Sequence, residues 1–191
     1  MPAQDDRQLA EETLSYIRQT METASTFTAV SGWGLVAVGS VGLVAAWLAH
    51  ATGEAAPLNV WLPAAVVALA CSATANGMKA KRLDVPLWSG AFRKMVWGLV
   101  PALIAGAFLT RALAIQDADI LVPGTWLAVY GTGVAASGMF SVRALRWMGL
   151  AMLGLGAVAL VRPAIGLTLL AAGFGGVHVL FGAYIAHRHG G

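Results

Sequence analysis

Six long apolar stretches, separated by short polar segments, run along the chain. They span residues 28–49, 58–78, 95–113, 120–141, 147–161 and 164–186. A helix rises about 1.5 Å per residue, so about 20 residues cross a hydrocarbon core of about 30 Å. The fifth stretch is the shortest, and it lies between Arg146 and Arg162, whose long side chains can reach the headgroups. The pattern predicts an all-α integral membrane bundle of six transmembrane helices.

The segment before the first stretch is polar, with apolar residues at helical spacing. Leu14, Ile17 and Met21 lie three and four residues apart, while charged and amide side chains take other positions. This predicts a short amphipathic cytoplasmic helix, which either lies on the protein's own surface or docks onto a partner or a second copy. The predicted parts are an N-terminal helix over residues 1–27, a transmembrane domain over 28–186 and a cytoplasmic tail over 187–191.

The composition agrees with lipid as the surrounding solvent. Hydrophobic residues make up 58% of the chain and charged residues 11%, whereas a soluble domain carries about 25% charged residues. The mean hydropathy is +0.73. The single cysteine, Cys71, excludes an internal disulfide and a multi-cysteine metal cluster.

The distribution of Lys and Arg predicts the orientation of the helices. If the N-terminus is cytoplasmic, the outer loops hold only Arg111 and Arg162, and all other basic residues lie inside. The bias places both termini in the cytoplasm, and it explains the basic residues better than nucleic-acid binding does. The Ala/Gly/Val-rich, Lys-poor composition indicates a multi-pass protein of the bacterial cytoplasmic (inner) membrane.

The main cytoplasmic loop, residues 79–94, is strongly basic. Pro86 and Gly90 are expected to break any long helix there. Its basic residues suit anionic lipid headgroups or a partner protein, although the orientation alone would also place them there. These residues are Lys79, Lys81, Arg82, Arg93 and Lys94.

Two segments of the chain, residues 30–46 and 122–138, align without a gap. Each carries a stripe of small residues at seven-residue spacing, which includes Gly32 and Gly39 in the first and Gly124 and Gly131 in the second. With three spans per half, the two helices would run in opposite directions, as in the inverted repeats of transporters. Close helix packing alone also explains small-residue stripes.

His178 lies well inside the sixth stretch and is the strongest candidate for a ligand pocket. As a structural residue it would form a hydrogen bond with a neighbouring helix, such as the one that bears Tyr130 and Ser137. As a functional residue it would line a cavity with Asn76, near a kink at Pro101 in the third stretch. That pocket would take a quinone, a haem or another neutral or lipophilic molecule.

A haem between two helices needs two histidines at similar depth, and one chain does not offer such a pair. His50 lies at the outer end of the first stretch, whereas His187 and His189 lie at the cytoplasmic end of the chain. Only a homodimer that joins His178 to its copy would supply both ligands. No set of residues predicts a metal site, and no cofactor is expected in the primary interpretation.

The sequence contains no nucleotide-binding loop, nucleophile elbow or zinc-protease motif. No acidic residue lies within a predicted span, which disfavours proton-coupled and sodium-coupled transport. We therefore expect a non-catalytic membrane accessory protein that engages a cytoplasmic partner or a second copy through its N-terminal helix and basic loop. The alternative is a small transporter or ligand-pocket protein for a neutral or lipophilic molecule.

Overall fold

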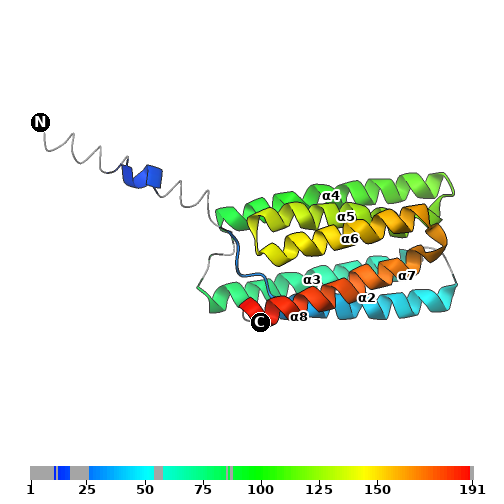
Figure 1. The fold of residues 1–191 in the computed structure, drawn as a ribbon, viewed down its shortest axis with the longest axis horizontal. Coiled ribbons are helices and arrows are strands. Elements are labelled where there is room, and N and C mark those ends of the chain that lie inside the picture. Colours follow the sequence, from blue (N-terminus) through cyan, green and yellow to red (C-terminus); the bar gives the residue numbers. More distant parts are fainter. Residues whose placement is uncertain are drawn as a thin grey trace, which may run out of the picture.

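The computed structural model describes residues 11, 13–17, 26–53, 58–84, 86 and 88–189. Six helices in this part of the chain are long and apolar enough to cross a membrane, which confirms the predicted bundle (Figure 1). The first three spans are α2 (Gly32–Thr52), α3 (Leu58–Arg82) and α4 (Gly90–Ile115). The fourth consists of a 3-10 turn (Asp119–Leu121), α5 (Val122–Ser137) and a second 3-10 turn (Gly138–Phe140).

The fifth span is the single helix α6 (Arg143–Val161), whereas the sixth changes its helix type along its length. It begins with a 3-10 turn (Pro163–Ile165) and α7 (Gly166–Leu170), continues as a π-helical segment (Ala171–Val177) and ends as α8 (His178–His189). Among the residues described, no strand forms, and Phe27 and Ser141 make an isolated bridge.

Serine caps set two helix starts that hydropathy alone placed differently. The Ser31 side chain accepts a hydrogen bond from the Gly34 N–H, so α2 begins at Gly32. Ser89 accepts one from Phe92 in the same way, so α4 begins at Gly90. Because α3 ends at Arg82 and α4 begins at Gly90, the helix is interrupted within the basic loop as predicted, and Gly90 is the first residue of the next helix.

The six spans form two units of three helices. In the first unit α2 packs between α3 and α8, and in the second unit α5 packs between α4 and α6 (Figure 1). The sixth span connects them, because α7 contacts both α2 and α5 while α8 belongs to the first unit. We call the end of the bundle that carries residues 26 and 189 the terminal end, and the opposite end the far end.

Glycines bring the helix backbones close together within each unit. A Cβ atom on Gly131 of α5 would lie 2.6 Å from the Leu153 amide nitrogen of α6. One on Gly182 of α8 would lie 2.7 Å from the Val36 nitrogen of α2. Real Cβ atoms do not approach backbone so closely, so only glycine allows these helices their present separation.

The two small-residue stripes contact spans that are not equivalent in the chain. Gly32 and Gly39 of α2 face α8, in the sixth span, whereas Gly124 and Gly131 of α5 face α6, the fifth span. In an inverted repeat of three plus three spans, the counterpart of the sixth span is the third. The aligned glycines therefore serve close packing in both units and do not occupy symmetry-related positions.

The glycine contacts predict a large effect at one position of α6 and almost none two residues away. We expect Gly156→Val to destabilise the protein by about 1–3 kcal/mol, because its Cβ would lie 2.8 Å from the Ala128 Cα atom. Gly154→Val is the control, since a Cβ there meets no atom within 4 Å. Thermal unfolding in detergent, followed by size-exclusion chromatography, measures both variants. Equal midpoints for the two variants would contradict the packing described for α5 and α6.

Candidate functional site

His178 joins the two units in the interior of the bundle. Its Nε2 atom lies 3.1 Å from the Tyr130 hydroxyl of α5, and its Nδ1 atom lies 3.2 Å from the Gly173 carbonyl oxygen. A carbonyl can only accept, so Nδ1 carries the proton and Nε2 accepts a hydrogen bond from the Tyr130 hydroxyl. Both ring nitrogens of this fully buried side chain are satisfied.

The π-helical segment positions this histidine and surrounds it with aromatic rings. The Phe174 ring stacks on the His178 ring at a centroid distance of 5.8 Å and lies 4.9 Å from the Tyr130 ring. Trp61 of α3 also contacts Phe174, at 6.5 Å between ring centroids. The imidazole therefore lies in a packed aromatic cluster that contains residues of both units.

This geometry matches the structural alternative for His178. The expected hydrogen bond to the helix that bears Tyr130 is present. The haem scheme needs a free Nε2 atom that a second copy of His178 can approach. The ring is 0% exposed within one chain, and its Nε2 atom is occupied, so such a pair cannot form while this packing holds.

The other predicted pocket residues lie apart from His178. Asn76 accepts a hydrogen bond at its Oδ1 atom from the Ser31 N–H, at 2.8 Å. Ser137 donates one to the Met95 carbonyl oxygen, also at 2.8 Å, and so links α5 to α4. Pro101 is exposed on α4. Asn76 and Ser137 therefore make hydrogen bonds to parts of the chain other than His178.

Residues 26–31 form an extended strap that crosses the terminal end of the bundle. At its start Phe27 is almost fully buried, and its N–H donates to the Phe140 carbonyl oxygen at 2.8 Å. The Ser141 hydroxyl donates to the Phe27 carbonyl oxygen at 2.7 Å. The Phe27 ring also packs on Phe92 of α4, with 5.0 Å between the centroids. The strap is thus anchored to the second unit here.

Three residues further along, the strap is anchored to the first unit. The Lys79 ammonium group donates to the Val30 carbonyl oxygen at 3.0 Å, and Asn76 accepts from the Ser31 N–H. The N–H and carbonyl groups of Phe27, the Val30 carbonyl oxygen and the Ser31 N–H are thus hydrogen-bonded where the strap is buried, as burial of such groups requires. The strap connects the two units at the terminal end, as His178 connects them deeper in the bundle.

This arrangement corrects one prediction for the basic segment. Lys79 is only 6% exposed and holds the strap, so it is not a headgroup contact. Lys81, Arg82 and Arg93 are exposed at the terminal end. The Lys94 ammonium group lies 6.0 Å above the centre of the Phe140 ring.

The N-terminal amphipathic helix is described only in part. Residues 13–17 are helical, and their apolar side chains do not pack on the bundle: Leu14 is 65% and Ile17 47% exposed. Met21 lies outside the described residues. The predicted extent of this helix, 1–27, overlaps the strap, which begins at residue 26 and is not helical.

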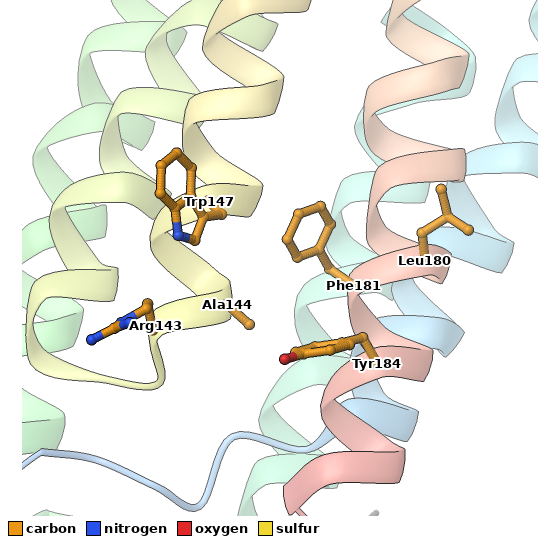
Figure 2. Close-up of a pocket in the computed structure, with 6 residues that line it drawn as sticks. All are labelled: Arg143, Ala144, Trp147, Leu180, Phe181 and Tyr184. Carbon is orange, nitrogen blue, oxygen red and sulfur yellow. The ribbon is translucent and has the colours of Figure 1, made fainter.

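A groove of about 450 Å³ lies between α6 and α8 near the terminal end, and no sequence pattern indicated it (Figure 2). The first and second units contribute one wall each. The rings of Phe181 and Tyr184 project from α8 towards α6, where Ala144 and Trp147 form the opposite wall. The groove results from the packing of two units, so residues 143–147 and 180–184 carry no common signal in the sequence.

Groups of side chains suited to metal binding are absent from the described residues, which contain no cluster of three or more His, Cys, Asp or Glu.

No family model matches the sequence, and no curated protein and no solved structure matches it either. The residues at the terminal end, with their exposed helix, exposed basic groups and groove, are therefore the candidate functional site.

The His178 contact predicts that one hydroxyl group contributes to stability. Tyr130→Phe leaves the buried Nε2 atom without its donor, and we expect a loss of about 1–2 kcal/mol. Tyr184→Phe, at an exposed tyrosine, should leave the thermal midpoint in detergent unchanged. Equal stability of the Tyr130→Phe variant and the parent protein would show that the hydrogen bond contributes nothing.

The strap predicts a second, local effect. Lys79→Met removes the donor to the Val30 carbonyl oxygen and should open the strap more often. Ala29, within the strap, is completely buried, so a cysteine at position 29, in a Cys71→Ser background, reports the opening by its rate of maleimide labelling. We expect an increase of about tenfold with Lys79→Met.

Lys81→Met is the matched control, because Lys81 is exposed on the same helix. Its labelling rate should equal that of the parent protein. Similar acceleration by both changes would mean that loss of positive charge, rather than loss of the hydrogen bond, opens the strap.

Proposed function

We propose that the protein is a non-catalytic accessory protein of the bacterial cytoplasmic membrane, and that its terminal end docks a cytoplasmic partner protein. The observation that carries the proposal is the exposure of Leu14 and Ile17 on the N-terminal helix. A short helix can bind a partner by inserting apolar side chains three residues apart into an apolar groove of that partner.

The distribution of charge supports a cytoplasmic position for the terminal end. Exposed basic residues lie there on α3, α4, α6 and α8, among them Arg82, Arg93 and Arg188. The far end carries Arg111 and Arg162. Cytoplasmic segments of membrane proteins carry the excess of Lys and Arg, so a partner that reaches this end is a cytoplasmic protein.

The exposed basic groups also define the surface that such a partner would present. Lys81, Arg82 and Arg93 lie near the ends of α3 and α4, and none of them is buried. Charge complementarity guides association and disfavours partners with like charge. The partner would therefore present an apolar groove for Leu14 and Ile17, next to acidic residues for the basic ends of α3 and α4.

The transporter or ligand-pocket alternative receives less support at the residues first considered for it. His178 and Tyr130 satisfy one another, and Asn76 is bonded to the strap. An ion or solute path through the bundle would need polar groups free to contact it. His178, Tyr130 and Asn76, which were considered for such a path, are used in hydrogen bonds within the protein.

Photocrosslinking in the native host membrane tests the docking proposal. A photoreactive amino acid at position 14 should give one crosslinked product of defined mass. Ile17→Ser should reduce the yield several-fold, because one exposed apolar anchor is removed. A photoreactive group at Arg111, at the far end, should not give this product.

The control variant is Glu11→Gln, which changes charge on the same helix and keeps its apolar side chains. It should leave the yield within about twofold of the parent. A product with twice the mass of the protein would show that the helix docks onto a second copy of this chain and not onto a cytoplasmic partner. Absence of any product at position 14, with normal expression, would overturn the proposal.

A further inference from the structure

The groove between α6 and α8 lies near the terminal ends of both helices, where a membrane-spanning helix meets the lipid headgroups. Arg143 is the first residue of α6, and Trp147 follows one turn later, about 6 Å along the axis. Tyr184 lies five residues before the end of α8, and Leu180 lies one turn further from that end. Trp and Tyr favour this boundary because one part of each ring system is apolar and the other forms hydrogen bonds.

The walls of the groove are apolar and open to the surroundings of the helices. Phe181 and Ala144 line it from opposite sides, and Leu180, at 70% exposed, extends from α8 away from α6 (Figure 2). A hollow beside hydrocarbon loses dispersion contacts unless another group fills it. The volume of about 450 Å³ falls within the range of about 300–1,000 Å³ found for ligand sites.

Two arginines lie near the terminal end of this groove. Arg143 is exposed at the start of α6 and is one of the residues that line the groove; in the close-up view its side chain extends away from α8, so it must turn to reach a phosphate beside Tyr184 (Figure 2). The Arg188 guanidinium carbon lies 5.9 Å from the centre of the Tyr184 ring. None of the six residues that line the groove is acidic. Guanidinium groups bind phosphate oxygens strongly and often through two hydrogen bonds.

We infer that this groove binds one acyl chain of an anionic phospholipid, whose phosphate is held at the rim by Arg143 and Arg188. The upper part of the chain lies between Phe181 and Ala144, and Trp147 and Tyr184 flank the glycerol region. The charge at the rim selects an anionic over a zwitterionic headgroup. This site does not include the N-terminal helix, so the lipid inference and the docking proposal can be tested independently.

Native mass spectrometry of the full chain tests the inference. The protein is reconstituted into vesicles that contain equal amounts of phosphatidylglycerol and phosphatidylcholine, and is then transferred into a mild detergent. We expect one retained phosphatidylglycerol molecule, favoured over phosphatidylcholine by about tenfold. Equal retention of the two lipids by the parent protein would overturn the inference.

Two pairs of variants locate the retained lipid. In the double variant Arg143→Gln with Arg188→Gln, the preference should fall to near unity, while Arg93→Gln, an exposed arginine at the same end, should keep it. Ala144→Phe fills the groove and should reduce retention of phosphatidylglycerol several-fold. Ala105→Phe, on the exposed face of α4, should not.

The charge variants keep the test decisive even if Ala144→Phe fails to fold, because both rim arginines are exposed. An equal loss of preference with Arg93→Gln would show that net charge, and not this groove, selects the lipid, and the inference would be wrong. Unchanged retention in a folded Ala144→Phe variant would likewise place the lipid elsewhere.

Discussion

Hydrocarbon offers no hydrogen-bond partner to a polar group and no hydrophobic drive between two apolar helices, and the structure depends on how the chain meets that constraint. Association must come from close packing and from a few internal polar contacts. Glycine supplies the first, as where Gly131 of α5 meets the backbone of α6 and Gly182 of α8 meets that of α2. These contacts bring helix backbones together within each unit, and Gly173 of the sixth span adds a close contact to Leu127 of α5 in the second unit.

Besides this packing, polar contacts join the two units at two depths. In the interior, the Tyr130 hydroxyl bonds to His178, whose other nitrogen is held by the π-helical segment of the sixth span. At the terminal end, the strap bonds to Ser141 of the second unit and to Lys79 of the first. Burial of an ammonium group is costly unless it is hydrogen-bonded. The buried Lys79 ammonium group accordingly donates to the Val30 carbonyl oxygen of the strap. The groove between α6 and α8 lies in the region between these two connections, where the units separate.

The sequence was sufficient for the six spans because length and hydropathy are properties of each segment alone. Residues Ser31 and Ser89 could have corrected the helix starts, since a serine three residues before a bonded N–H is a local capping signal. The position of His178 well inside the sixth span was also enough to predict a hydrogen bond to the helix that bears Tyr130. Lys79 could not be assigned in this way, because its burial depends on a strap nearly fifty residues earlier in the chain. The groove likewise depends on the relative position of two units, which no single segment encodes.

The placement of polar groups also explains why function should be sought at the terminal end. The polar side chains considered for the interior are bonded to one another or to backbone, so they leave little for a substrate to contact. The exposed apolar and basic groups lie instead beside the strap. The covalent path from the helix that bears Leu14 to the bundle passes through Phe27 before it reaches Val30. Any force that a bound partner exerts along the chain therefore acts first on the bonds to Phe140 and Ser141, which hold the strap to the second unit, and only then on Lys79.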